Sequence, residues 1–380
     1  MNTVLLTLGR LPKALDLARS FARAGWRVVV AEPHRRHLTG ASRSVARRRQ
    51  VTAPALDPAA YLRDLARLVR EEGASLVVPV SEEAMHVAFL RPLLPEGVRL
   101  LAMPPDLTLR LHDKHGFVRE ASAMGLTVPE SAALGDPRAR HLAETGDVIV
   151  KPLHACSGRG VRRIPRGGAL PPPGQAIVQR LVQGAEHSSC TLAHAGRVQA
   201  SAVYRGTLMS GSVAVGFERV EHPAIEAWIA RFVAGTGWTG FIAFDFILDA
   251  AGTPWGIECN PRTTSGLHFF AEADLAPAIL DPAHPLRFRP ERRLQQFWSC
   301  LTETQASFGD WPRFRAHLRH LLGTRDVTWR ATDPLPLLTM PWTAWPIIRE
   351  ARRRGVPFGE VATLDVGWIS DAPAAPSAAA

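Results

Sequence analysis

Residues 240–262 read GFIAFDFILDAAGTPWGIECNPR. Two apolar segments flank a turn that runs from Asp249 to Pro254 and contains a glycine, a pattern typical of a β-hairpin. Each segment carries one carboxylate, Asp245 in the first and Glu258 in the second. Pairing of the two strands would place these two acids side by side.

A carboxylate within an apolar strand is costly to bury unless a cation or a hydrogen-bond donor compensates it. Asn260 adds an amide oxygen two residues after Glu258, and Mg²⁺ prefers such hard oxygen ligands. Arg262 would then face a phosphate held by the metal. The alternative is a hairpin whose acids form structural salt bridges with some of the many arginines. The pattern favours the metal site.

The size and composition of the chain indicate a globular protein of several domains. Its 380 residues are too many for one ordinary core and predict two or three domains. No apolar segment is long enough to span a membrane, and the N-terminus leads into a strand pattern without a signal peptide. The four cysteines form no CxxC pair and lie at Cys156, Cys190, Cys259 and Cys300. We therefore expect a cytoplasmic protein with no membrane partner and no structural zinc.

The net charge of +10 raises the question of nucleic-acid binding. The basic residues are nearly all arginines and are dispersed along the chain, apart from short clusters such as 47–49 and 352–354. Neither cluster is interleaved with aromatic residues that could stack on bases. We expect a solvated basic face, no nucleic-acid partner, and compatibility with small anionic substrates.

Lysine is rare in this arginine-rich chain, which makes the three lysines informative. They are Lys13, Lys114 and Lys151. A lysine kept in such a composition can mark a site that needs a compact ammonium group rather than a planar guanidinium. We expect Lys13 to lie in an ordinary surface helix, whereas Lys114 and Lys151 stand in contexts that suggest a site.

The first hundred residues alternate strand and helix patterns. Strands are predicted at residues 4–8, 27–31 and 75–80, with a helix at 12–24 and another that begins at Ser81-Glu82-Glu83. This order indicates a parallel sheet flanked by helices. Residues 35–49 are predicted to form a loop or a short helix. The first turn lacks GxGxxG, so no dinucleotide site is proposed there.

Several further patterns follow in the middle of the chain. Asp113-Lys114 leads into a helix that ends near residue 124, and a strand at 147–151 ends in Lys151-Pro152. A loop of small residues follows at 154–161, and another strand is predicted at 177–182. In chain order with the hairpin, these patterns resemble the ATP-grasp superfamily of carboxylate–amine ligases and related carboxylases. The resemblance covers about residues 1–275, and the hairpin spacing is its most specific part.

The resemblance implies a fold that is α/β and α+β, with a Rossmann-like pre-ATP-grasp domain at 1–110 and an ATP-grasp domain at 111–285. Beyond the part that it covers, helical sequence patterns predict a C-terminal extension at 286–371, and a Pro/Ala/Ser-rich composition predicts a disordered tail at 372–380. The two lobes of the ATP-grasp domain would span about 111–178 and 179–285. Within the extension, residues 294–322 and 342–354 have helical patterns, and its tryptophans are expected mainly to pack.

The resemblance also implies ATP and Mg²⁺ as cofactors, with Mn²⁺ as a substitute. Lys114 and Lys151 would neutralise the α- and β-phosphates. A glycine loop would cover the phosphates through Ser157, Gly158 and Gly160. Gln179 and the backbone of Leu181 would form hydrogen bonds with the adenine edge, and Ile257 would pack on the adenine face. Glu186 would accept hydrogen bonds from the ribose hydroxyls.

The metal ligands implied by the resemblance are Asp245, Glu258 and Asn260. Arg262, together with Lys151, would act in catalysis by stabilising the transferring phosphoryl group. His154 and His268 are the histidines expected nearest the site. One departure from D-alanine-ligase-like relatives is Ala243, which stands where they carry an arginine. The role of that arginine in stabilising the oxyanion could pass to Arg262 or to an arginine of an earlier loop. The candidates in the earlier loop are Arg205 and Arg219.

The function implied is an ATP- and Mg²⁺-dependent ligase that activates a small carboxylate as an acyl phosphate and joins it to an amine. The partners would be a small-molecule carboxylate and an amine, and the chain could also form a homodimer. One alternative is a carboxylase-like enzyme that activates bicarbonate. Another, from a different class, is an ATP-binding regulatory protein without turnover.

Overall fold

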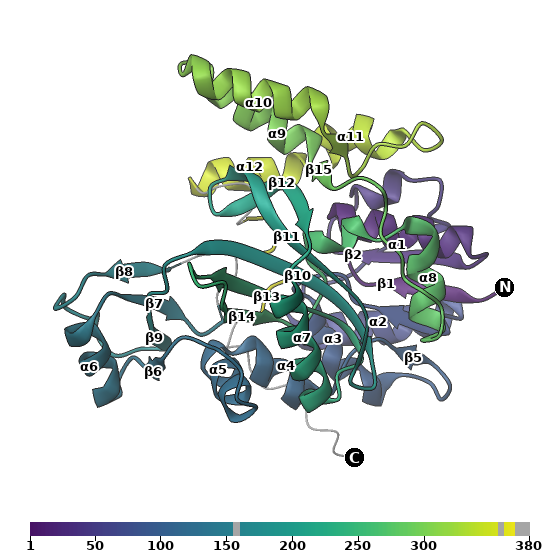
Figure 1. Ribbon diagram of the computed structural model, residues 1–380. Coiled ribbons are helices and arrows are strands. Elements are labelled where there is room, and N and C mark those ends of the chain that lie inside the picture. Colours follow the sequence, from purple (N-terminus) through teal and green to yellow (C-terminus); the bar gives the residue numbers. More distant parts are fainter. Residues whose placement is uncertain (155–159, 356–360, 369–380) are drawn as a thin grey trace.

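The computed structural model describes residues 1–154, 160–355 and 361–368. The described chain contains three sheets, which lie one after another in sequence, and Figure 1 labels most of their strands. The N-terminal sheet lies at one end of the molecule, a small four-stranded sheet at the other, and a long seven-stranded sheet crosses between them. This mixed architecture confirms the predicted fold class.

The N-terminal sheet is parallel throughout and has the strand order β3-β2-β1-β4-β5. The strands are β1 (Thr3–Leu6), β2 (Arg27–Glu32), β3 (Arg47–Gln50), β4 (Leu76–Val78) and β5 (Arg99–Leu100). The sheet is covered by α1 (Pro12–Arg23) and α2 (Pro58–Glu72), followed by the short α3 (Ala84–Val87) and the 3₁₀ helix η2 (Ala88–Leu93). One prediction was wrong: the arginines at 47–49 form the edge strand β3 instead of a loop, because they pair with β2.

Helices α4 (Pro105–His112) and α5 (Lys114–Ala123) connect the N-terminal sheet to the rest of the chain. Asp113 lies between them, and its side chain accepts a hydrogen bond of 2.6 Å from the backbone N–H of Gly116. This N-cap fixes the first turn of α5. Lys114 therefore occupies the first helical position, and its side chain is buried.

The four-stranded sheet has the order β6-β9-β7-β8, and all its pairs are antiparallel. Its strands are β6 (Ser131–Ala133), β7 (Val148–Pro152), β8 (Arg162–Ile164) and β9 (Ala176–Arg180). Helix α6 (Pro137–Thr145) supplies apolar residues that pack with those of β7 and β9. The strands predicted at 147–151 and 177–182 are confirmed, with each end displaced by no more than two residues.

The seven-stranded sheet has the order β14-β13-β10-β11-β12-β15-β16. Its strands are β10 (Ala185–His194), β11 (Arg197–Ser210), β12 (Val213–Val220), β13 (Gly240–Leu248), β14 (Pro254–Asn260), β15 (Arg293–Gln295) and β16 (Arg325–Asp326). Helix α7 (Pro223–Thr236) packs aromatic side chains against β13, where Trp228 and Phe232 stack with ring centroids 5.4 Å apart and contact Phe244. This aromatic core holds the strand that carries Asp245.

The N-terminal sheet and the seven-stranded sheet share a hydrophobic core. Val4 and Leu6 of β1 belong to the same buried cluster as Leu192 of β10 and Phe241 of β13. The same cluster includes apolar residues of the 3₁₀ helix η3 (Ser265–Phe269) and of helix α8 (Glu272–Leu280). This continuous core places the two sheets in a fixed relation.

The C-terminal extension is mainly helical but contributes two strands to the long sheet. Its helices are α9 (Phe297–Ala306), α10 (Trp311–Gly323), α11 (Leu335–Thr343) and α12 (Trp345–Arg354), which gather at one end of the molecule in Figure 1. The helical prediction was wrong at residues 294 and 295, because these residues lie in β15 and pair with β12. Among the described residues, none of the helices combines the length and the apolar character needed to cross a membrane.

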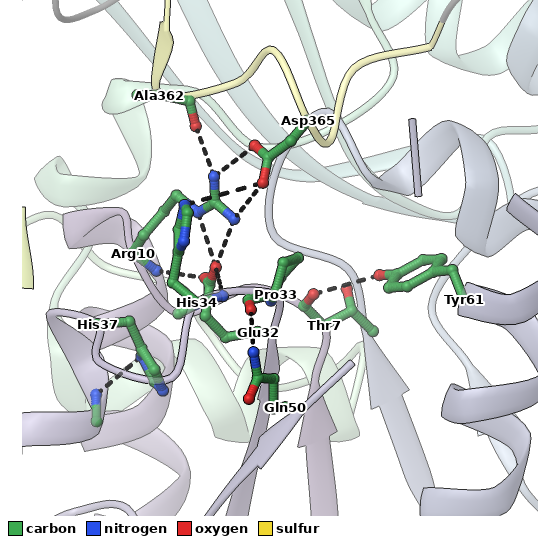
Figure 2. Close-up of polar contacts among 12 residues, drawn as sticks. Thr7, Arg10, Glu32, Pro33, His34, His37, Gln50, Tyr61, Ala362 and Asp365 are labelled. Atoms are coloured by element: carbon green, nitrogen blue, oxygen red, sulfur yellow. Dashed lines mark hydrogen bonds and ion pairs between the residues drawn. The ribbon is translucent and has the colours of Figure 1, made fainter. Parts of the chain in front are cut away.

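Residues 361–368 return to the carboxyl ends of β1 and β2, as Figure 2 shows. Arg10, which follows β1, donates to both carboxylate oxygens of Asp365 at 2.6 and 3.0 Å. The same guanidinium donates to Glu32 at the end of β2, at 2.5 and 2.8 Å. One buried arginine therefore joins the last described segment to the first two strands.

Candidate active site

The hairpin formed by β13 and β14 brings the two predicted acids together. Asp245 and Glu258 are direct partners in the antiparallel register, and Asn260 is opposite Ala243. The register shifts immediately after Asp245, so Ile257 has no partner on β13. This bulge allows Glu258, rather than its neighbour, to lie beside Asp245.

Asp245 is held by two hydrogen bonds. Ser188 of β10 donates its hydroxyl to Oδ1 at 2.6 Å, and Asn260 donates its amide Nδ2 to Oδ2 at 3.0 Å. Burial, and after it the negative charge of Glu258, raises the pKa of Asp245 to about 6. A carboxyl group in this setting favours a nearby cation, which would stabilise its ionised form.

Two of the three lysines are buried close to these acids. The ammonium of Lys114 lies 3.3 Å from Oε1 of Glu258, and Lys151 on β7 donates to Oε1 of Gln179 at 2.9 Å. Burial lowers the pKa of Lys151, and the charge of Glu258 opposes that effect. The structure thus brings Lys114, Lys151, Gln179 and the acidic pair into one region, although they come from five different elements.

The residues proposed for the nucleoside lie on strands that border this region. Gln179 is buried on β9 opposite Ile149 of β7. Leu181 follows β9 and donates its backbone N–H to the carbonyl of Asp147 at 3.0 Å. Glu186 is exposed on β10, next to Ile247 in the register of β10 and β13.

The glycine loop can be followed only at its end. Ser157 and Gly158 lie outside the described residues. Gly160 has a φ of +71°, and a Cβ added there would lie 2.8 Å from Cγ of Pro152. Both the left-handed backbone and the close approach to Pro152 favour glycine at this position.

Arg262 lies at the junction between the hairpin and the N-terminal sheet. Its Nη2 lies 2.5 Å from Oε1 of Glu82 and donates to Oδ1 of Asn260 at 2.9 Å. Glu82 was not among the predicted site residues. It follows β4, and polar residues at the carboxyl ends of parallel strands are a signal that could have found it.

Lys13 corrects an expectation drawn from the sequence. It is 8% exposed instead of lying on a surface, and it donates to the carbonyl of Thr263 at 2.7 Å. Burial, followed by the charge of Arg262, lowers the pKa of Lys13 to about 7. The third lysine is therefore part of the interface next to Arg262, which only the packing of α1 against the hairpin end reveals.

The two histidines expected nearest the site, His154 and His268, each lie beside an aspartate. His154 lies 3.7 Å from Asp113 at the start of α5, and its ring stacks on His112. His268 is buried and its Nδ1 lies 2.6 Å from Oδ2 of Asp16 on α1.

The two arginines considered as substitutes at the Ala243 position have other contacts. Arg205 is half exposed and pairs with Glu218 at 2.7 Å. Arg219 lies over the ring of Phe288, 4.3 Å from its centroid. Arg262, in contrast, contacts Asn260 directly.

The potential metal ligands at the hairpin are carboxylate and amide groups. Within the ranges that the structure describes, no group of three or more His, Cys, Asp and Glu side chains could hold a metal. The candidate site instead offers two carboxylates and the amide of Asn260. This set fits Mg²⁺, which keeps several waters and is commonly bound through one or two carboxylates together with substrate phosphates.

Comparison with known families agrees with this geometry. Residues 111–266 match the family model of the ATP-grasp domain. The chain therefore contains an ATP-grasp domain, and the resemblance seen in its sequence is confirmed. A comparison with curated proteins finds no significant sequence match.

Several solved structures share the fold. The biotin carboxylase domain of Hydrogenobacter thermophilus 2-oxoglutarate carboxylase, solved with MgADP, ADP and bicarbonate, is 14% identical, with a TM-score of 0.58 over 75% of this chain and 70% of that one. The ADP complex of N5-carboxyaminoimidazole synthetase from Staphylococcus aureus is 13% identical, with a TM-score of 0.59 over 76% and 80%. The L-amino acid ligase of Bacillus licheniformis is 16% identical, with a TM-score of 0.57 over 77% and 78%. At these identities the likeness shows a common fold.

Proposed function

We propose that the chain is an ATP- and Mg²⁺-dependent ligase that activates a small carboxylate, such as an amino acid or metabolite acid, and joins it to an amine. The observation that carries this proposal is the pairing of Asp245 with Glu258 on the hairpin, next to buried Lys114 and Lys151. Two adjacent acids and two buried lysines form the charge pattern that a metal-bound polyphosphate requires. The ATP-grasp domain supplies the same expectation independently.

Each residue of the site has a separate part in this reaction. Lys114 and Lys151 bind nucleotide phosphates, and Asp245, Glu258 and Asn260 are the residues that would hold Mg²⁺. The metal, when bound, neutralises charge on the β- and γ-phosphates and makes the γ-phosphorus more electrophilic.

The nucleoside and the glycine loop complete the nucleotide site in this proposal. Gln179 and Leu181 form hydrogen bonds with the adenine edge, and Ile257 packs on the base. Glu186 accepts hydrogen bonds from the ribose hydroxyls. Ser157, Gly158 and Gly160 belong to the loop that covers the phosphates.

The chemistry has two steps that need no protein nucleophile. A carboxylate oxygen of the substrate attacks the γ-phosphorus, and the bond between that phosphorus and the leaving oxygen of ADP breaks. The amine nitrogen then attacks the acyl carbon of the acyl phosphate, inorganic phosphate leaves, and the nitrogen loses a proton to give the amide. Arg262 stabilises the negative charge that develops in both steps, and Lys151 stabilises it in the first.

A second candidate is an enzyme of the same class that activates bicarbonate as carboxyphosphate. It is favoured by the likeness to a biotin carboxylase domain solved with bicarbonate and by Ala243, which removes an arginine expected in D-alanine-ligase-like enzymes. An ATP-binding protein without turnover is disfavoured by the intact Asp245, Glu258 and Asn260 set, because a binding protein does not need to keep its metal ligands.

The proposal is tested by ADP release in the presence of Mg²⁺. The purified chain is screened against amino acids and other small carboxylates, each with and without an amine, and products are identified by mass spectrometry. Amide formation that depends on both substrates supports the ligase. Stimulation by bicarbonate without an organic acid supports the carboxylase alternative instead.

Glu258→Gln is the matched variant for this assay. We expect it to abolish ATP turnover while leaving the circular dichroism spectrum of the protein unchanged, because the side chain is similar in size and only its charge is lost. Near-normal turnover in this variant would contradict the two-acid metal site. Glu71→Gln, on an exposed helix face of the N-terminal domain, serves as the control and should leave turnover unchanged.

The oligomeric state is a separate proposal. The H. thermophilus biotin carboxylase domain is described as a dimer, and we propose that this chain also forms a homodimer. Its mass in solution, measured by light scattering, decides between a monomer and a dimer.

A further inference from the structure

Large apolar side chains are exposed mainly in the C-terminal extension. Of the thirteen that are exposed in the described part of the chain, seven lie between residues 308 and 345. They are Phe308, Trp311, Leu322, Leu335, Leu338, Trp342 and Trp345. Scattered single residues of this kind are ordinary, but a concentration of them marks an interaction surface.

Four of these residues lie on one face of α11 and α12. The two helices are joined at Ala344, which bonds like a helical residue: its N–H donates to the carbonyl of Met340 at 2.8 Å, and its carbonyl accepts from Ile348 at 2.9 Å. The exposed residues follow at alternating steps of three and four, which is the spacing of one helix face. This α11–α12 stripe consists of Leu335, Leu338, Trp342, Trp345, Arg349, Arg352 and the adjacent Arg353.

The stripe is apolar in its first half and basic in its second. Leu335, Leu338, Trp342 and Trp345 are 55%, 54%, 68% and 52% exposed. The guanidinium of Arg352 lies 5.9 Å from the ring centroid of Trp345, so the two halves meet at a tryptophan–arginine contact. The nearest acid on α12 is Glu350, which pairs with Arg353 at 3.0 Å.

The opposite face of α12 is already occupied. Ile347 and Ala351 are buried and pack with Val361 and Ala362 of the returning C-terminal segment. The helix is therefore anchored by one face and presents the stripe with the other. The chain segment that carries the stripe is basic, because residues 311–354 contain nine arginines and three acids.

We propose that the α11–α12 stripe attaches the protein to the surface of an anionic lipid membrane. Trp342 and Trp345, with the two leucines, enter the boundary between headgroups and acyl chains, where the amphipathic indole ring is favoured. Arg349, Arg352 and Arg353 contact lipid phosphates and anionic headgroups. The sequence predicted no membrane partner because no segment is long enough to span, but attachment to a surface needs no span.

The charge pattern disfavours a second copy of this chain as the occupant. In a parallel twofold pairing of the stripe, Arg349 and Arg352 would meet the same residues of the other copy and repel them. In an antiparallel pairing, the apolar half of each copy would face the basic half of the other. Burying the tryptophans of two copies against each other would therefore bring like charges together in the parallel pairing and would desolvate arginine in the antiparallel pairing.

A nucleic acid is disfavoured by the aliphatic part of the stripe. Proteins bind single-stranded nucleic acids through aromatic side chains that stack on the bases and basic side chains that contact the phosphates. Leu335 and Leu338 supply neither kind of contact. A bilayer, in contrast, uses all three components: leucine and tryptophan in the interface and arginine at the phosphates.

The test is co-sedimentation of the full chain with vesicles. One set of vesicles contains phosphatidylcholine alone, and the other contains equal parts of phosphatidylcholine and phosphatidylglycerol. We expect binding only to the anionic set, weakened about tenfold or more when NaCl is raised well above the physiological range. Brominated lipids in these vesicles should quench tryptophan fluorescence.

Two pairs of variants assign the binding to the stripe. Trp342→Ala with Trp345→Ala should remove the quenching, and Arg349→Glu with Arg352→Glu should lower vesicle affinity by about tenfold or more. Trp311→Ala on α10 replaces a tryptophan of similar exposure outside the stripe and should bind as the wild type does.

Several results would overturn the proposal. These are no sedimentation with anionic vesicles, equal binding to neutral vesicles, or equal losses for Trp311→Ala and the stripe tryptophans. Dimerisation that the stripe variants abolish would identify a second copy as the occupant. Binding of single-stranded RNA that the same variants abolish would identify a nucleic acid. None of these measurements depends on ATP turnover, so the proposed ligase activity stands or falls separately.

Discussion

Replacing Glu32 by Gln should destabilise the protein more than replacing Asp365 by Asn, although both acids bind Arg10. Glu32 is fully buried at the end of β2, and its two oxygens accept from the side chain of Arg10 and from the backbone N–H groups of Gly9, Arg10 and His34. A glutamine has one accepting oxygen, so its amide N–H groups would face backbone donors. Asp365 is about a quarter exposed and contacts Arg10 from the other side.

The expected costs follow from what each substitution leaves behind. Without Glu32, the counter-charge that remains for buried Arg10 in the described part of the chain is the partly exposed Asp365. Breaking a buried pair in this way costs about 3–5 kcal/mol. Without Asp365, Arg10 remains paired with Glu32, and Asn still accepts one hydrogen bond, so the loss is about 1 kcal/mol.

The pH dependence of the Glu32→Gln effect has a definite sign. Burial would raise the pKa of Glu32, but the charge of Arg10 and its hydrogen bonds outweigh burial and lower it. The stabilisation is therefore complete above the ordinary glutamate pKa of about 4.3 and is lost as the pH falls below it. The difference between wild type and Glu32→Gln should shrink in acid.

The assay is urea unfolding followed by circular dichroism at neutral pH and near pH 4. Glu71→Gln, which removes half of an exposed ion pair with Arg67, is the control and should cost less than about 0.5 kcal/mol. Equal costs for Glu32→Gln and Asp365→Asn would refute the distinction between a buried counter-charge and a peripheral one. So would a Glu32→Gln effect that grows in acid.

Three further predictions concern other parts of the molecule. Lys151→Ala should weaken nucleotide binding, measured by calorimetry, far more than Lys13→Ala does. Lys13→Ala should mainly lower the melting temperature, because Lys13 is buried at an interface. Equal effects of the two variants on nucleotide binding would contradict this prediction. Burial lowers the pKa of His86 to about 4, so stability should fall as the pH drops from about 6.5 toward 4, and a His86→Gln variant should show a smaller fall. Gly184→Ala should destabilise the fold by about 2 kcal/mol or more in urea unfolding, because its Cβ would lie 2.1 Å from the carbonyl oxygen of Leu248; wild-type stability would show that the backbone moves freely there.

Local sequence patterns predicted much of the fold. The alternation of apolar strands and helices in the first hundred residues indicated the parallel sheet, because each element has its own periodicity and its own end signals. The segment 240–262 indicated a hairpin with two adjacent acids, because strand pairing joins residues close in sequence. The edge strand β3 was missed because three consecutive arginines carry no strand pattern, and the sheet edge alone accommodates them.

The candidate site depends on contacts that sequence proximity cannot reveal. Glu82 reaches Arg262 and Lys13 reaches Thr263 only because the N-terminal sheet packs against the end of the hairpin. The C-terminal segment reaches Arg10 across 355 residues of sequence. The sequence by itself determined the hairpin and its acids, since these follow from local periodicity and spacing, and its resemblance to the ATP-grasp superfamily indicated the type of domain. Only the tertiary structure decided which charges are buried together and which tryptophans remain outside, because both depend on how distant segments cover one another.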